Sequence, residues 1–206
     1  MAFDGLNILA SFPGWAPDFD LQYRQEQSRA AGGKTYVKDM GDPLWGGTWV
    51  SKNLSPNLLD AWRARLKWLE NGLQVFRATP PSRFFPIAYP NGSWPTGGGF
   101  SGAGTLGTVN VNRRAISAAG FPAGYRHSVG DYVQIGLTDL HQILEDATTG
   151  EFEVRPHLWP GVAAGASLKV LRPFCLMSIV PGSITTTADA STGRGKISFQ
   201  AFESRG

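Results

Sequence analysis

Residues 130–155 read GDYVQIGLTDLHQILEDATTGEFEVR and contain three short segments that glycine-bearing turns separate. In the last of these segments Phe152 and Val154 alternate with charged side chains. Period-two alternation of this kind is typical of a strand with one face in a core and the other face in solvent. Three neighbouring β-strands are therefore expected, over 132–135, 140–145 and 151–155.

The same pattern of short segments and breaks covers most of the 206 residues. The 26 glycines and 14 prolines fall largely between the segments, where they interrupt regular structure. In segment 105–112, the side chains of Leu106, Val109 and Val111 are expected to share the inner face of one strand. The chain is predicted to be mainly β, with further strands over 35–38, 44–51, 73–78, 84–89, 105–112, 114–118, 168–171, 176–180 and 197–202.

One segment, about 55–71, is predicted to form an α-helix. Ser55 can cap its start, Pro56 suits the first helical position, and Asn71 and Gly72 tolerate the backbone conformation that ends a helix. Hydrophobic side chains recur at three- and four-residue spacing, which predicts one apolar stripe packed on a sheet. The stripe consists of Leu58, Leu59, Trp62, Leu66 and Leu69.

Two breaks in composition divide the chain. Residues 80–107 are rich in proline and glycine, and a second break lies at Arg172 and Pro173. Between the breaks stand about 80 residues with five or six predicted strands, which is the size of a small barrel. The last 35 or so residues resume long strands. We therefore expect a split domain into which a smaller domain is inserted.

The charge pattern excludes several kinds of partner. The net charge is +3, and the 19 basic residues are scattered, whereas nucleic-acid grooves need a dense basic stripe. No nucleic-acid recognition is therefore expected.

No apolar stretch approaches the ~18 residues of a membrane helix, so we expect no membrane insertion. The N-terminus lacks a signal-peptide pattern, and the single cysteine cannot form an intramolecular disulfide, which favours synthesis in the cytoplasm.

Cofactor and metal motifs lack the context that they need. Residues 102–107, GAGTLG, match the G-x-G-x-x-G pattern, but a dinucleotide site requires a strand before it and a helix after it. Here a glycine-rich loop precedes the pattern and a predicted strand follows. His127, His141 and His157 are widely separated, and zinc needs three or four convergent ligands. No cofactor and no metal are expected.

The candidate catalytic groups are equally isolated. Glu151 and Glu153 flank Phe152 and share one solvated strand face, whereas glycoside hydrolysis needs two carboxylates that face each other across a sugar. No G-x-S-x-G pattern is present, and Cys175, between two apolar neighbours, is interpreted as a small buried hydrophobe. No catalytic residue is predicted, and the protein is not expected to be an enzyme.

Aromatic residues are plentiful in a chain that has little charge. There are seven Trp and 12 Phe, but only 17% of the residues are charged, which indicates surface that is buried against a partner. Trp45 and Trp49 lie on one face of a predicted strand and are expected in the core. The candidate partner or glycan contacts are Trp94, Phe100 and Trp159, which lie in predicted loops.

The order of these segments resembles a known family. The capped helix SPNLLDAWRARLKWLENG at 55–72 is followed by GDYVQIG at 130–136, EFEVRPHLWPGV at 151–162, LRPFCLMSI at 171–179 and the long strand GRGKISFQAFES at 193–204. With a strand pair formed by 34–39 and 45–51, this order is similar to that of distal tail proteins of bacteriophages with long non-contractile tails, in the small two-domain type. The resemblance begins at about Lys34 and leaves residues 1–33 without a role.

This resemblance implies a tail-tube-like β-sandwich domain from residues 1–88 and 173–206, with an inserted OB-like barrel domain at 89–172. It implies a structural virion protein that forms a homo-oligomeric ring, a hexamer or a trimer, at the distal end of the tail. Its partners would be the tail tube protein and the baseplate hub or tail tip protein, after assembly in the host bacterial cytoplasm.

An alternative of another class is a carbohydrate-binding module. In that hypothesis the inserted barrel presents Trp94, Phe100 or Trp159 to glycans on the host surface. A tryptophan fluorescence response to a saccharide would favour it. Barrels of the OB type also bind single-stranded nucleic acid on stacked aromatic side chains, but basic residues are too few between Tyr89 and Gly165 to favour that function.

Overall fold

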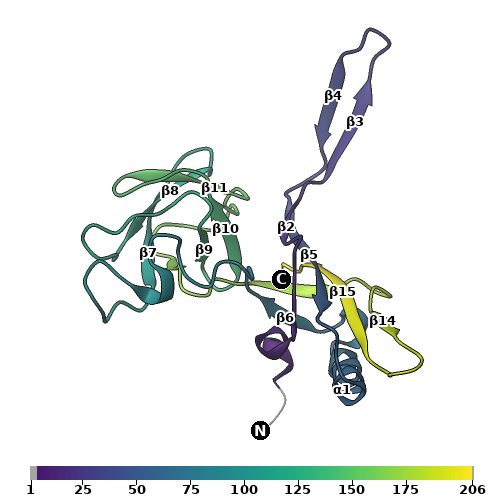
Figure 1. Cartoon of the computed structure of the whole chain (residues 1–206). Coiled ribbons are helices and arrows are strands. Elements are labelled where there is room, and N and C mark those ends of the chain that lie inside the picture. The colour runs from purple at the N-terminus through teal and green to yellow at the C-terminus, as the bar shows by residue number, and fades with distance from the viewer. Residues whose placement is uncertain (1–3, 206) are drawn as a thin grey trace.

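The computed structural model describes residues 4–205 of the chain. It consists mainly of β-strands with one α-helix, and it contains a small closed barrel, so the predicted fold class is confirmed. Figure 1 shows three parts: an open sheet with the helix beneath it, a barrel to one side, and a narrow two-stranded arm that extends away from both. The open sheet is built from both ends of the chain, and the barrel is built from the middle.

The open sheet has seven strands in the order β1-β5-β15-β13-β6, with β2 beside β5 and β14 beside β15. Its central pair joins residues far apart in sequence, because Trp49 lies opposite Phe199 and Gly47 lies opposite Ala201. This pairing makes the two ends of the chain one structural unit. The strands are β1 (Gly14–Trp15), β2 (Asp20–Gln22), β5 (Leu44–Ser51), β6 (Val75–Ala78), β13 (Cys175–Ile179), β14 (Thr185–Ala188) and β15 (Gly195–Glu203).

The core of this sheet is aromatic. The rings of Trp49 and Phe199 stack with centroids 5.5 Å apart, and Phe76 meets both rings edge to face. Offset-stacked and edge-to-face pairs of this kind add to the stabilisation that burial alone provides. A short 3-10 helix, η1 (Gly5–Ser11), packs beside β6 and places Ile8 in the same core. The expectation that Trp49 and its neighbour Trp45 are core residues is confirmed.

The helix α1 (Pro56–Lys67) begins at the predicted proline and buries Leu59, Trp62 and Leu66. The helix ends at Lys67 and not at about residue 71 as predicted, and two further details of its prediction are wrong. Leu58 is 50% exposed, because it lies outside the stripe that its neighbours form against the sheet. The side chain of Ser55 makes no capping hydrogen bond, and only its backbone carbonyl accepts a bond, from the Leu59 amide. A separate 3-10 turn, η2 (Glu70–Gly72), follows the helix.

The barrel is closed by antiparallel pairing in the order β10-β11-β8-β7-β12-β9, and β9 returns to β10. Because the first and last strands pair, the barrel leaves no free strand edge. Its interior holds a separate core that includes Leu106, Ile116, Val133, Phe152 and Leu168. The strands are β7 (Ala103–Val109), β8 (Ala115–Ala119), β9 (Tyr132–Ile135), β10 (Asp139–Ile143), β11 (Glu151–Arg155) and β12 (Ser167–Lys169).

Strand β7 departs from the predicted inner face. The register with β8 shifts between Leu106 and Val109, and the strand ends before residue 111. A bulge of this kind inserts an extra residue into one strand and changes which side chains point inward. Leu106 is buried, but Val111 is fully exposed, so the prediction that Val111 shares the inner face is wrong.

The arm consists of β3 (Gln25–Arg29) and β4 (Thr35–Asp39), which pair only with each other among the described residues. The predicted pairing of 34–39 with 45–51 is therefore wrong. β4 turns back on β3 through a tight turn in which the Gly33 amide donates to the Ala30 carbonyl. Gly33 has a φ of +83°, a conformation that glycine adopts without steric cost.

The predicted strand over 84–89 is also wrong, since these residues form turns between the sheet and the barrel. Prolines at positions 80, 81, 86 and 90 have no amide hydrogen to donate to a sheet ladder, which explains the difference. A short 3-10 turn, η3 (Pro90–Gly92), follows. The return connection runs beside this one, because the Arg172 amide donates to the Phe84 carbonyl at 2.9 Å.

Candidate functional site

The carboxylates that could have served hydrolysis are held by neighbours on the barrel surface. Glu151 accepts a hydrogen bond from the Thr108 hydroxyl at 2.8 Å, and Glu153 pairs with the Arg155 guanidinium at 2.7 Å. The hydrogen bond from Arg155 and its positive charge lower the pKa of Glu153. Each of the two carboxylates thus has its own surface partner, as is usual for a solvated strand face.

Two histidines in the barrel are buried and neutral near pH 7. Burial lowers the pKa of both His127 and His141 to about 4. His127 stacks on Phe152 with centroids 4.5 Å apart, and Nδ1–H of His141 donates to the carbonyl of Pro156 at 2.8 Å. The prediction that His141 is a structural histidine on a strand agrees with this geometry. Within residues 4–205, no group of three His, Cys, Asp or Glu side chains could hold a metal ion.

Cys175 lies inside the sheet core and has no exposed surface. Burial raises the pKa of its thiol well above the ordinary value, so the sulfur stays protonated. Its Sγ–H donates to the Ala78 carbonyl at 3.9 Å. A protonated, enclosed thiol packs as a small hydrophobe, as the sequence predicted.

Trp94 and Phe100, two of the three predicted contact residues, belong to an aromatic cluster at one end of the barrel. Their rings meet edge to face with centroids 5.1 Å apart, and Trp94 also packs against Tyr89 and Tyr125. Trp94 is only 7% exposed, whereas Phe100 is half-buried. Trp94 therefore fastens the connection after residue 89 to the barrel and leaves no open ring face.

Trp159, the third predicted residue, lies at the junction of the barrel and the open sheet. The Arg205 guanidinium lies over its ring at 4.6 Å, and Arg205 also pairs with Glu203 at 2.8 Å. Glu203 in turn accepts a hydrogen bond from the backbone amide of Trp45 in β5. Trp159 therefore connects the end of the chain to the barrel, and one of its ring faces is covered.

A second contact ties the barrel to the sheet at the same junction. The Trp45 indole N–H donates to the Leu140 carbonyl of β10 at 2.7 Å, and its ring lies 5.4 Å from that of Tyr132 in β9. The buried side chain of Leu140 packs into the core of the open sheet, although its strand belongs to the barrel. These buried contacts, together with Arg205 on Trp159, fix the two parts against each other.

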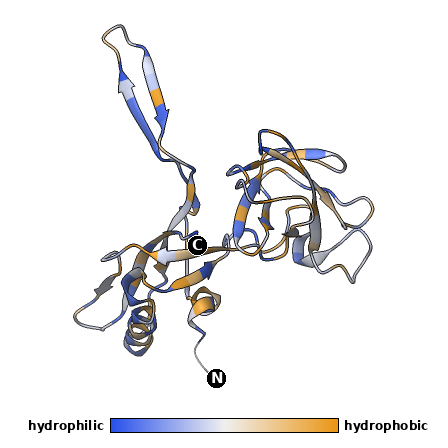
Figure 2. Cartoon of the chain, turned by 180° about the vertical axis from the view of Figure 1, so that it is seen from behind, coloured by the Kyte–Doolittle hydropathy of each residue, from blue (hydrophilic) through white to orange (hydrophobic). Residues whose placement is uncertain are grey.

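The arm is the most exposed part of the described chain. Every residue of β3 and β4 is exposed to solvent. Large apolar or aromatic side chains lie open along it, with exposed fractions of 58% for Tyr23, 52% for Tyr36, 57% for Val37 and 52% for Met40. Figure 2 colours the arm mainly hydrophilic, with a hydrophobic band on β4. Residues 23–40 carry four cations and two carboxylates, so the arm is weakly basic.

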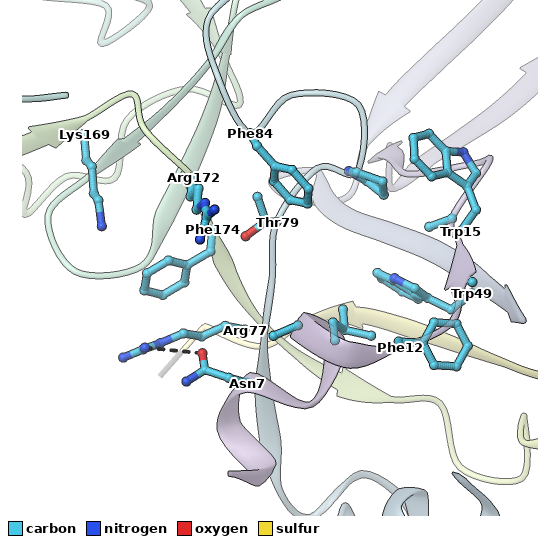
Figure 3. A pocket seen from close by; sticks show the side chains of 15 residues that line it. Asn7, Phe12, Trp15, Trp49, Arg77, Thr79, Phe84, Lys169, Arg172 and Phe174 are labelled. Carbon is cyan, nitrogen blue, oxygen red and sulfur yellow. Dashed lines mark hydrogen bonds between the residues drawn. The ribbon is translucent and has the colours of Figure 1, made fainter. Parts of the chain in front are cut away.

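A groove of about 570 Å³ lies where the open sheet meets the two connections to the barrel. Its lining comes from η1, β1, the connection after β6 and the connection after β12 (Figure 3). A smaller hollow of about 130 Å³ shares Trp15, Ala16 and Pro81 with it. We call the two together the junction groove. Figure 3 shows the cationic side chains together with Phe174 at one end of it, and Trp15, Trp49 and Phe12 at the other.

The junction groove was not predicted from the sequence, and of the arm only the strand at 35–38 was predicted. For the arm a signal existed: Gly32 and Gly33 stand between two polar segments of matching length, a pattern typical of a hairpin turn. The groove has no such signal, because its walls come from segments near residues 10, 80 and 170 that only the fold brings together.

No family model matches the chain, and no curated protein is similar to it. Among residues 4–205, no helix combines the length and the apolar character that crossing a bilayer requires.

Proposed function

We propose that this protein is a structural ring subunit at the distal end of a phage tail, where it connects the tail tube to the baseplate hub or tail tip. In this role the chain works by contact with copies of itself and with its tail neighbours. It needs no catalytic residue, cofactor or metal. Its place in the cell would be the bacterial cytoplasm during assembly and the virion afterwards.

The single observation that carries this proposal is the arm. An isolated two-stranded hairpin is at best marginally stable in water, and this one has no contact with a core. Its exposed Tyr36, Val37 and Met40 would gain burial only against another molecule. An arm of this kind on each subunit, received by the next copy around a ring, accounts for both features.

Free strand edges give further support. Within the described residues β14 pairs only with β15, so its outer edge is available for main-chain pairing. Ring formation needs two different surfaces that fit each other on successive copies. The arm and the edge of the open sheet provide two such surfaces on one subunit. The assignment to the tail tip in particular rests on the order of segments that resembles distal tail proteins.

The experiment is native mass spectrometry of the purified protein, alone and with its tube and hub partners, followed by electron microscopy of any assembly. We expect a mass that is a whole multiple of the 22.2 kDa chain, six or three copies, and a ring with a central opening. A protein that stays monomeric with both partners present would refute the proposal.

The carbohydrate-binding alternative has less support from the geometry. Trp94 is buried. Trp159 and Phe100 are each partly exposed, but Arg205 covers one face of Trp159, and the Phe100 ring packs against other rings of the aromatic cluster. Sugar recognition on a protein surface uses open aromatic faces. A saccharide that changes the tryptophan fluorescence of the folded protein would restore this alternative.

A further inference from the structure

The junction groove has an unbalanced charge. Three cations, Arg77, Lys169 and Arg172, line it, and no carboxylate does. All three are exposed, and none has an acidic partner within 4.0 Å among the described residues. Arg126 on the barrel surface, by contrast, pairs with Asp146 at 2.6 Å. The groove thus holds positive charge that nothing else in the described chain neutralises.

Two of the cations are held in place by aromatic rings. The guanidinium of Arg77 lies 4.8 Å from the centre of the Phe174 ring, and that of Arg172 lies 6.0 Å from the centre of the Phe84 ring. Arg77 also donates to Oδ1 of Asn7 at 3.5 Å. An arginine stacked on a ring keeps its N–H groups free along the edge, where they can bind a carboxylate side by side. Both arginines are therefore oriented for an acidic ligand before it arrives.

Apart from the polar side chains of Asn7 and Thr79, the rest of the groove is apolar. Beyond the cations its walls include Leu9, Phe12, Trp15, Ala16 and Trp49, and Trp15 is 53% exposed. A volume of about 570 Å³ is in the range of pockets that enclose a drug-sized ligand, roughly 300–1,000 Å³, so a few residues of a peptide would fit. The smaller hollow beyond Trp15 lengthens the site, as an extended segment requires.

We infer that the junction groove receives an extended segment of another protein in which carboxylates stand next to aromatic or aliphatic side chains. The carboxylates would bind Arg77, Arg172 and Lys169, and the apolar side chains would cover Trp15 and Phe12. Single-stranded nucleic acid fits less well, because it needs cations along its whole track, whereas here they gather at one end. The inference holds for the single chain and does not depend on the ring.

The occupant is not a segment of this same chain. The arm is weakly basic and would be repelled by the cationic end of the groove. Two triplets of the chain place an aromatic residue between carboxylates, at 18–20 and 151–153, but each uses its aromatic ring internally. Phe19 stacks on Trp45, and Phe152 is buried in the barrel core. A partner of different sequence is therefore required.

The test is a fluorescence anisotropy titration with a labelled peptide of the sequence GDDFGDDFG. We expect saturable binding at low salt. The affinity should fall about tenfold or more in the Arg77→Ala/Arg172→Ala double variant. The matched control is Arg194→Ala/Lys196→Ala, which removes two exposed cations from outside the groove and should leave the affinity unchanged. Circular dichroism on both variants checks that the fold is intact.

Two further probes separate the possible ligands. A peptide with Asn in place of every Asp should lose most of the binding, and added salt should weaken binding of the acidic peptide because it screens exposed charges. A labelled ten-nucleotide oligo(dT) should bind more weakly than the peptide. The inference is overturned if the acidic peptide does not saturate, if both double variants lose affinity equally, or if oligo(dT) binds more tightly.

Discussion

The arm and the barrel are both built from short antiparallel strands, but only the barrel has an interior. In the barrel each strand contributes to a shared core, as Phe152 and Val154 do in β11. In the arm, strands of the same five-residue length have every side chain exposed. Main-chain pairing alone therefore defines the arm, whereas burial stabilises the barrel. The absence of an interior in the arm is the reason that we propose it as a surface for another molecule.

The largest expected difference between the two regions is in stability. Phe152→Ala should lower the free energy of unfolding by about 3–5 kcal/mol, because it leaves a cavity in the barrel core. The matched change in the arm, Tyr36→Ala, should change it by no more than about 0.5 kcal/mol. Urea unfolding of the isolated protein measures both values. A large cost for Tyr36→Ala would mean that the arm packs against its own chain.

The barrel should also respond to acid, through its buried histidines. Unfolded His127 binds a proton below its ordinary pKa of 6.5, but the folded state does so only near 4. The unfolded state therefore binds more protons between these values, and stability falls as the pH falls from about 6.5 to 4. For His127, this difference in pKa lowers the free energy of unfolding by about 2 kcal/mol between pH 7 and pH 5.

The His127→Phe variant isolates this effect, since a phenylalanine ring keeps the stacking on Phe152 and removes the titrating group. Urea unfolding at pH 7 and pH 5 should show a smaller loss in the variant than in the unchanged protein, by about 2 kcal/mol. The arm contains no histidine, so its exposure to solvent should stay the same across this range. Equal losses of stability in the two proteins would contradict the claim that His127 causes the acid sensitivity.

A comparable effect is expected where the barrel joins the sheet. Trp45→Phe removes the N–H that the Leu140 carbonyl accepts and leaves a buried acceptor without its partner. The expected cost is about 1–3 kcal/mol, and the two parts should unfold in more separate steps. Differential scanning calorimetry measures both changes. The control is Trp15→Phe, at an exposed position; a matching effect there would show that Trp45 does not couple the two parts.

The smallest effect on stability is expected for Val37→Asp in the arm. Val37 is 57% exposed, so an added charge costs the isolated chain almost nothing. In an assembly the same charge would be buried in an interface without a partner, which is strongly unfavourable. We expect normal unfolding but loss of the ring in native mass spectrometry. A second change, Thr187→Asp on β14, tests the edge of the open sheet in the same way, because loss of the ring there too would point to that edge as the receiving surface.

The parts of the fold that local pattern specifies were predicted well. Strand β5 has the predicted bounds, the helix begins at the predicted proline, and alternation located β11 and β15. Of the arm, the strand at 35–38 was predicted, and β3 was missed because it has no apolar alternation, since neither of its faces is buried. The junction groove was missed for a different reason. It depends on how the sheet and the barrel are placed, and this placement rests on contacts between distant residues such as Trp45 and Leu140.

The exposure of individual side chains was predicted less accurately than the positions of the strands. Trp94 was chosen because it stands in a loop rich in proline and glycine, but that loop folds back onto the barrel end. The prediction for Val111 is wrong in the opposite direction. It was expected to be buried, but the register shift ends β7 early and leaves this side chain in solvent. Both outcomes depend on packing between segments, which a single sequence does not encode locally.

The most direct test of the central claim is hydrogen–deuterium exchange of residues 25–39, in the free chain and in the assembled particle. The account predicts rapid exchange at these amides in the free chain and strong protection after assembly, while the barrel strands are protected in both states. Equal exchange of the arm in the two states would contradict the claim that the arm exists to bind a neighbouring subunit.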